Sequence, residues 1–136
     1  MFRFEKLESW RIAIEFAKSV YAVTRRFPDV ERFGLTSQMR RSAVSISSNI
    51  AEGSGRGSDA DFAHFIEIAY GSLMEVVSQL QIARQEAFLS EREYTDIYQA
   101  SDRLARMLSG LRASLTQRNS KRPTSGHRPS TLDARP

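Results

Sequence analysis

Residues 62–83 read FAHFIEIAYGSLMEVVSQLQIA, and this stretch decides the fold class. Its apolar residues recur every three or four positions without a break: Phe62, Ile66, Ala69, Leu73, Val76, Leu80 and Ala83. Such spacing places them on one face of an α-helix, whereas a half-buried strand would alternate at every second position. The pattern predicts a helix of roughly 40 Å that begins after Ser58 and ends near Ala87.

Three further segments of the chain show the same helical periodicity. They run from about residue 6 to 26, from 35 to 52, and from Ser90 onward. Ser90 and Glu93 have the spacing of a capping box, which marks the start of the last helix. Four amphipathic helices with short connections predict an all-α fold, an antiparallel up-down four-helix bundle within residues 1–116.

The first helix carries more apolar surface than a single bundle requires. One stripe consists of Leu7, Trp10, Ile14, Ala17 and Tyr21. A second stripe, about 120° away around the helix, consists of Ile12, Phe16, Val20, Val23 and Phe27. A bundle helix needs an apolar stripe of little more than about 100°. We assign the second stripe to an oligomer interface; the alternative is that the N-terminal residues or the loop at residues 27–35 cover it.

The charge is distributed unevenly along the chain. It has 20 lysines and arginines and 16 acidic residues, which gives a net charge of +4. Residues 117–136 hold five basic residues and one acid, so this tail carries the whole excess. The tail is rich in Pro, Ser, Thr and Arg, and we expect it to be flexible. Binding of nucleic acid would therefore depend on the tail or on a local patch.

Composition limits the location and the chemistry that we expect. The chain has no cysteine, no signal-peptide-like N-terminus and no segment with the roughly 20 apolar residues of a membrane span. We therefore expect a cytoplasmic protein. His64 is the one histidine within residues 1–116, and it lies opposite the apolar face of its helix. Because di-metal bundles need two Glu-x-x-His motifs and covalent catalysis needs a nucleophile beside a base, we expect no metal, no cofactor and no enzymatic activity.

Residues 47–58, SSNIAEGSGRGS, raise the question of a phosphate site, since glycine-rich loops that lead into helices often bind phosphates. The stretch lacks the lysine of a P-loop and follows a helix instead of a strand. Asp59 and Asp61 lie in the first turn of the next predicted helix and would repel a phosphate there. We interpret Gly53 as the C-cap of one helix and Ser58 as the N-cap of the next.

The helix predicted at residues 35–52 carries polar residues outside its core face. We interpret Asn49 and Glu52 as candidates for ordering this region or for an interface. Phosphates of nucleic acid are the predicted ligands of six basic residues: Arg40, Arg41, Arg56, Arg118, Lys121 and Arg122. The alternatives are a solvated charged face, or ion pairs of Arg40, Arg41 and Glu52 across a subunit interface.

Three stretches of the sequence resemble one family of proteins. They are FEKLESW at residues 4–10, RFGLTSQMRRSAVSISSNIAEGSGRGS at 32–58 and DFAHFIEIAYGSLMEVVSQLQIA at 61–83. They resemble the four-helix-bundle, S23-like proteins encoded in intervening sequences of bacterial 23S rRNA genes. The resemblance covers roughly residues 2–115.

This resemblance implies a ring-like homo-oligomer, a pentamer in members of known structure. The architecture is also similar to the accessory variability proteins of diversity-generating retroelements, which bind nucleic acid and a reverse transcriptase. The activity of the S23-like family itself is not established. Ser47 departs from the family pattern, in which proline is common, and Val77 stands where a second acid usually follows Glu75. The latter argues against a paired-carboxylate role.

From these observations we predict a non-enzymatic, homo-oligomeric bundle that binds RNA or DNA and no membrane. A protein–protein adaptor without nucleic-acid contact is the alternative. An enzyme with a pocket between subunits is the least favoured interpretation.

Overall fold

The computed structural model describes residues 1–121 of the chain and the side chains of residues 1–118. It contains four α-helices: α1 (Glu8–Thr24), α2 (Leu35–Ser54), α3 (Asp59–Gln85) and α4 (Glu91–Lys121). The short 3-10 helices η1 (Arg3–Lys6) and η2 (Asp29–Glu31) precede α1 and α2. No strand occurs within the described residues, which confirms the prediction of an all-α fold with four helices.

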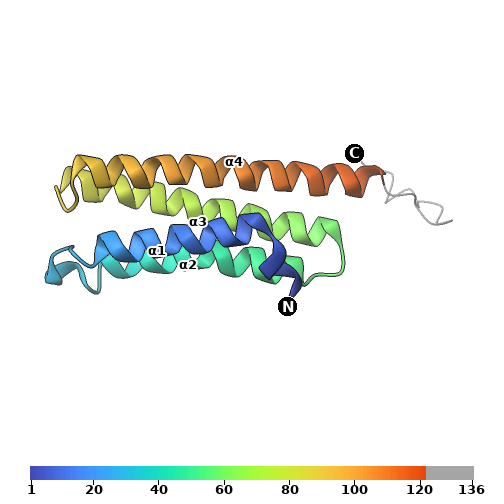
Figure 1. The fold of residues 1–136 in the computed structure, drawn as a ribbon, viewed down its shortest axis with the longest axis horizontal. Helices are drawn as coiled ribbons and strands as arrows, with labels where there is room; N and C mark the ends of the chain where they lie inside the picture. Colours follow the sequence, from blue (N-terminus) through green and yellow to red (C-terminus); the bar gives the residue numbers. More distant parts are fainter. Residues whose placement is uncertain (122–136) are drawn as a thin grey trace, which may run out of the picture.

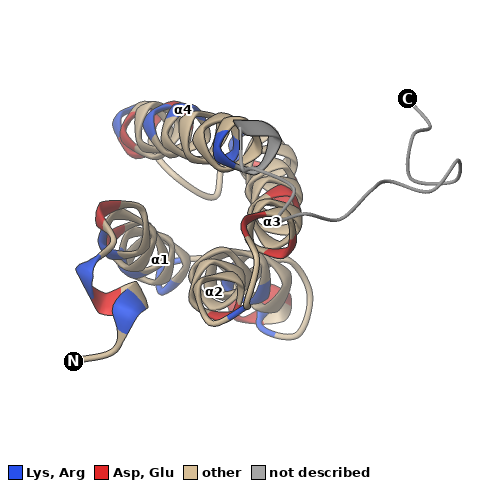
Figure 2. Cartoon of the chain, turned by 90° about the vertical axis from the view of Figure 1, so that its right-hand side faces the viewer, with Lys and Arg blue, Asp and Glu red and all other residues tan. Residues whose placement is uncertain are grey.

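The four helices lie side by side, and the chain reverses direction at each connection (Figure 1). Each helix contacts two others in a closed order: α1 with α2, α2 with α3, α3 with α4, and α4 with α1. The end view in Figure 2 shows this order around a common centre. The outer face shared by α1 and α2 therefore lies on the opposite side of the molecule from the outer face shared by α3 and α4.

The core lies between the helices and receives apolar side chains from all four. All seven apolar positions of α3 that predicted the helix are buried, among them Leu73 and Leu80. The other helices contribute fully enclosed side chains that pack on them: Val20, Ile46, Ile50, Leu104 and Leu108. Removal of this apolar surface from water is the main stabilising contribution to the fold.

The apolar stripe of α1 that we assigned to an oligomer interface lies mainly on the core side of the helix. Phe16, Val20 and Phe27 are buried in the core of their own chain, with Phe16 only 3% exposed. Ile12 and Val23 are partly buried against the same core. The prediction of a contact with a partner is therefore wrong for Phe16, Val20 and Phe27, and it stays a prediction for Ile12 and Val23.

The physical reason is that the inward face of α1 lies between the two apolar stripes. Ala13 and Ala17 mark its centre, and both are buried. The loop beyond α1 also faces inward, where the ring of Phe27 lies 5.5 Å from that of Phe88 in the α3–α4 connection. The outward apolar surface comes from the first stripe, where Tyr21 is 36% exposed.

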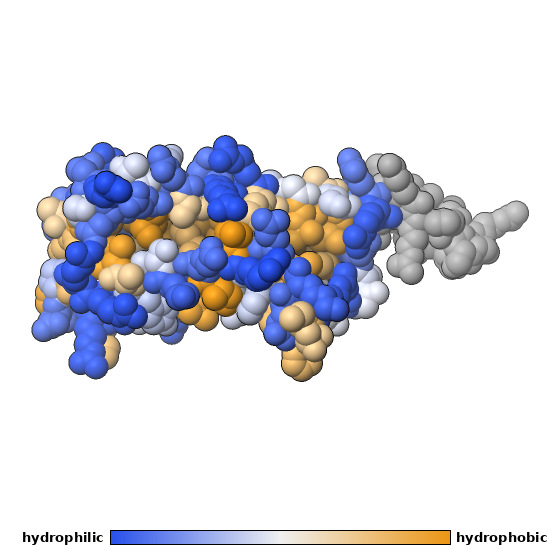
Figure 3. All heavy atoms as spheres, viewed as in Figure 1, coloured by the Kyte–Doolittle hydropathy of each residue, from blue (hydrophilic) through white to orange (hydrophobic). Residues whose placement is uncertain are grey.

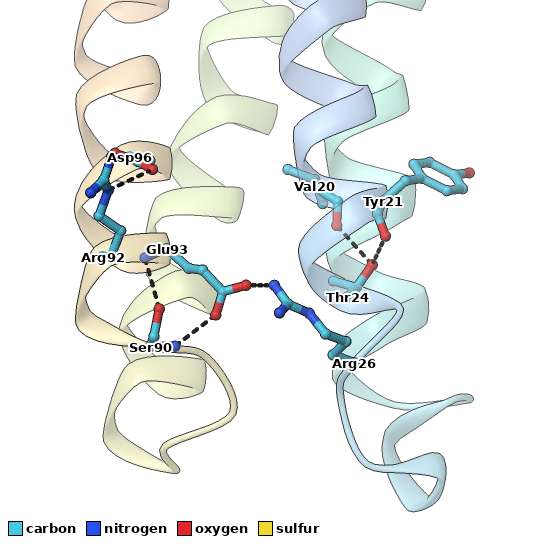
Figure 4. A network of polar contacts seen from close by, with 8 residues as sticks. All are labelled: Val20, Tyr21, Thr24, Arg26, Ser90, Arg92, Glu93 and Asp96. Atoms are coloured by element: carbon cyan, nitrogen blue, oxygen red, sulfur yellow. Dashed lines mark hydrogen bonds and ion pairs between the residues drawn. The ribbon is translucent and has the colours of Figure 1, made fainter.

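Both predicted N-caps are confirmed. The Ser58 hydroxyl accepts a hydrogen bond from the Asp61 backbone N–H at 3.1 Å. At the start of α4, the Glu93 N–H donates to Ser90 Oγ at 3.1 Å and the Ser90 N–H donates to Glu93 Oε1 at 2.8 Å (Figure 4). Glu93 also forms an ion pair with Arg26, so the capping box ties the start of α4 to the end of α1.

Gly53 is a buried position within α2 and not its C-cap, so that prediction is wrong. The helix continues to Ser54, and Gly55 occupies the C-cap. A Cβ atom at position 53 would lie 2.7 Å from the Cβ of Phe65 and 2.9 Å from Cδ1 of Phe62. The glycine is therefore needed because α2 and α3 approach each other closely at this point.

Helix α4 extends past residue 116, where we placed the end of the bundle. It continues to Lys121, and Arg118 donates to the two carboxylate oxygens of Asp59 at 3.0 and 2.7 Å. This bidentate pair joins the last turns of α4 to the first turn of α3. The rest of the predicted tail, residues 122–136 with Arg122, lies outside the described part of the chain.

Candidate functional site

Arg40 is half-buried and held against α1 by two contacts. Its Nε–H donates to Oγ1 of Thr24 at 2.9 Å, and its guanidinium carbon lies 4.7 Å from the ring centroid of Tyr21. The Thr24 hydroxyl in turn donates to the carbonyl of Val20 at 2.8 Å, as Figure 4 shows. The Nε of Arg40 is therefore used within the chain, while no acid of the described residues pairs with its guanidinium.

The neighbouring candidates lie in different surroundings. Arg41 is exposed on the outer surface of α2. Arg56 pairs with Glu52 at 3.1 Å, and its guanidinium lies 4.6 Å from the ring of Phe65. Glu52 therefore orders Arg56 and not the two arginines at the other end of α2.

Asn49 belongs to a polar seam between α2 and α3. Its side-chain amide donates to the carbonyl and the hydroxyl of Ser45, and Ser45 shares a 2.8 Å hydrogen bond with Ser72 of α3. One turn earlier, the Ser42 hydroxyl donates to Glu75 at 3.1 Å. Asn49 thus orders the contact between two helices of the same chain.

Sequence reasoning did not identify Ser72 and Glu75 as members of this seam. The available signal was a shared spacing of three and four residues among small and polar side chains on two successive helices: Ser42, Ser45 and Asn49 on α2, and Ser72, Glu75 and Gln79 on α3. Two such rows pack against each other when the helices run antiparallel.

Of the three candidates near the end of α4, only Arg118 has a described side chain. Its hydrogen bonds to Asp59 raise the pKa of Arg118 above its ordinary value. Lys121 is the last residue of α4, and its side chain lies outside the described set, as does all of Arg122. Arg118 therefore forms an ion pair with an acid of its own chain, as Arg56 does.

An apolar groove of about 550 Å³ runs along the outer face of α1 and α2. Its lining includes Ile14, Tyr21, Ala22 and Val44, with Lys18 and Arg25 among its polar members. Val44 is 41% exposed.

On the opposite side of the molecule, a smaller groove of about 220 Å³ between α3 and α4 is lined by a second set of partly exposed side chains: Tyr70, Met74, Val77 and Tyr98. The face seen in Figure 3 likewise mixes apolar with polar side chains.

A basic pocket of about 260 Å³ lies where α1 connects to α2. Arg25, Arg32 and Arg40 line it, together with the buried Thr36. Sequence reasoning singled out only Arg40, because the other two arginines reach the pocket through the reversal of the chain at Phe27 and Pro28. Each lies close to this turn in the sequence, which was the available signal.

Side chains of the types that bind metal ions do not cluster in the part of the chain that the structure describes. Within residues 1–121 no group of three or more His, Cys, Asp and Glu side chains is placed to hold a metal ion. His64 is exposed and lies 3.9 Å from Glu67 of its own helix. Among the same residues, no helix has the length and the apolar character that crossing a membrane requires.

Comparison with known proteins identifies the family of the chain. A solved structure of a protein of unknown function from the S23 ribosomal protein family of Bacteroides thetaiotaomicron is similar, with a TM-score of 0.68 and 24% sequence identity. The similarity covers 76% of this chain and 96% of that one, and at this identity it supports the fold alone. No functionally curated protein matches the sequence. The family model of the 23S rRNA-intervening sequence proteins matches residues 5–110, so the chain belongs to that family.

Proposed function

We propose that the chain is a non-enzymatic scaffold: an antiparallel up-down four-helix bundle that assembles into a ring-like homo-oligomer, a pentamer. The apolar groove on the outer face of α1 and α2 carries this proposal, because Tyr21 and Val44 line it and are both more than a third exposed. Burial of such surface against a second copy would remove it from water.

The second groove supports a ring over a simple dimer. Contact between two identical patches closes as a two-fold dimer, whereas a ring needs two different patches on every copy. The chain offers the α1–α2 groove on one side and the groove at Tyr70 and Met74 on the other. Membership of the family adds support, since the pentamer is the state that the family resemblance implies.

A single-cysteine experiment tests where the copies meet. The chain has no cysteine of its own, so Val44→Cys introduces one thiol into the α1–α2 groove. We expect its reaction with a thiol reagent to slow as the protein concentration rises through the range of assembly. Arg103→Cys, on an exposed position of α4, is the control and should react at a constant rate. Equal behaviour of both thiols at every concentration would refute the proposed interface.

Binding of RNA or DNA is the second function that we propose, and the arginines near the α1–α2 connection favour it. Arg25, Arg32, Arg40 and Arg41 form no ion pair with the described acids, so their charge is available to phosphates. Arg56 and Arg118 are less favoured, because Glu52 and Asp59 already neutralise them. We place this activity in the cytoplasm, which the absence of cysteine supports.

Titration of labelled RNA and DNA with the full chain and with a chain that ends after Lys121 tests this second function. The affinity should fall steeply as the salt concentration rises, because neutralised phosphates release counterions. Loss of the salt dependence on truncation would assign binding to the tail. Absence of binding by both chains at low salt would exclude nucleic acid and leave a protein–protein adaptor.

A further inference from the structure

We propose that the basic pocket at the α1–α2 connection binds a phosphate oxyanion. The pocket measures about 260 Å³, which suits a small ion better than a drug-sized ligand. The inference deepens the second proposed function, since it names the residues that would hold a phosphate group. Arg25 lines both this pocket and the α1–α2 groove, so the pocket adjoins the proposed subunit interface.

Charge is the first observation. Three arginines, Arg25, Arg32 and Arg40, line the pocket, and Asp29 is the one acid among its lining residues. None of the three arginines forms an ion pair within residues 1–118. Arginine presents several N–H donors in a planar fork that matches the oxygens of a phosphate. The pocket therefore holds an excess of unneutralised positive charge.

The second observation is a buried hydroxyl without a partner. Thr36 lines the pocket and is 7% exposed, and its Oγ1 atom forms no hydrogen bond within residues 1–118. A buried polar group without a partner is costly, and a bound water or ion commonly supplies the missing hydrogen bond. A phosphate oxygen in the pocket would supply the missing partner.

The start of α2 adds a third contribution, because Thr36 lies in its first turn. Gly34 at the N-cap has no side chain, and the first turn contains no acidic residue. The Glu31 carboxylate accepts one hydrogen bond, from the Leu35 N–H at 3.2 Å. The positive end of the helix dipole is thus only partly compensated and favours a further negative charge.

Arg40 is already in place for such a ligand. Its Nε bond to Thr24 and its contact with the Tyr21 ring fix the guanidinium before any ligand arrives. Binding then costs little side-chain entropy, and such preorganisation raises the affinity for the ligand.

Titration of the isotope-labelled full chain with inorganic phosphate, at constant ionic strength, tests the inference by nuclear magnetic resonance. We expect saturable shifts of the Thr36 amide and the Arg40 Nε–H. Arg32→Gln and Arg40→Gln should each weaken binding about tenfold, the effect of one charge-assisted hydrogen bond. Asp29→Asn should strengthen binding, and Arg103→Gln on α4 is the matched control that should change nothing.

Thr36→Val separates a binding role from a structural one. Without phosphate this variant should melt at the same temperature as the natural chain or higher, because valine removes an unsatisfied hydroxyl. Phosphate should then raise the melting temperature of the natural chain but not that of the variant. The inference is overturned if no saturable shift occurs, if Arg103→Gln weakens binding equally, or if Thr36→Val keeps the full response to phosphate.

The source of the phosphate group is distinguished by a second titration with a single-stranded RNA oligonucleotide. If Arg32→Gln and Arg40→Gln weaken both ligands, the site holds the backbone of a nucleic acid. Binding of phosphate without binding of RNA supports the site for a small phosphate ion and refutes the nucleic-acid function. If both variants weaken phosphate binding but leave RNA binding unchanged, the pocket is a site for a small phosphate ion and the nucleic acid binds to another surface.

Discussion

Substitution of Gly53 by alanine tests the close approach of α2 and α3. The new Cβ would lie 2.7 Å from the Cβ of Phe65 and 2.9 Å from the ring of Phe62, which is closer than carbon atoms can pack. The first of these atoms is fixed to the backbone of α3, so the helices must move apart at a cost of roughly 3 kcal/mol. Alanine returns about 1 kcal/mol through its higher helix propensity. We therefore expect Gly53→Ala to lower the free energy of unfolding by about 2 kcal/mol.

Urea denaturation at one fixed protein concentration measures this change. Gly110→Ala is the matched control, because position 110 is also within a helix and, apart from its own stretch of helix, no atom of the described residues would lie within 4 Å of a Cβ there. The control should stabilise the chain by about 1 kcal/mol. A Gly53→Ala chain that is as stable as the natural one, beside a control that behaves as expected, would refute the tight contact.

Three further predictions concern the connection between α3 and α4. Ala87 has a φ of 58°, a left-handed conformation that costs a non-glycine residue about 1 kcal/mol. Ala87→Gly should therefore raise the free energy of unfolding measured by urea titration, and a lower value would contradict this. Ser90→Ala removes the N-cap of α4 and should lower the same free energy by about 1 kcal/mol, whereas no loss would argue against the capping box. Hydrogen bonds from Arg84 lower the pKa of Glu91 in the folded chain. The Glu91 carboxylate therefore stabilises the fold at pH values above its pKa in the unfolded chain, and this contribution is lost as the pH falls through its pKa in the folded chain. The melting temperature of Glu91→Gln should consequently fall less on acidification than that of the natural chain, and parallel curves would contradict the pairing.

The number and the positions of the helices were predictable because their signals are local. The apolar spacing of α3 needed no knowledge of its neighbours, and the caps at Ser58 and Ser90 depend on residues three positions apart. Which side of α1 points toward the core was not predictable from such local signals. Two apolar stripes flank its inward face, and only the packing of α2 and α4 decides that Phe16 points inward while Tyr21 stays at the surface.

The candidate site shows the same division between local and distant causes. Arg40 and Arg41 are adjacent in the sequence, yet one rests against Tyr21 and the other is exposed. Arg25 and Arg32 belong to the basic pocket only because the chain turns back after α1. Gly53 could not be recognised as a packing residue, since its neighbour Phe65 comes from the next helix.

We claim that copies of the chain assemble through the α1–α2 groove, and light scattering of the purified full chain measures the mass of this assembly. We predict for the natural chain a mass about five times the 15.4 kDa of one copy. Val44→Glu should reduce that mass, because burial of a carboxylate at the interface carries a desolvation cost, while Arg103→Glu should leave it unchanged. A natural chain with the mass of a single copy, or a Val44→Glu chain that assembles as well as the natural one, would contradict the claim.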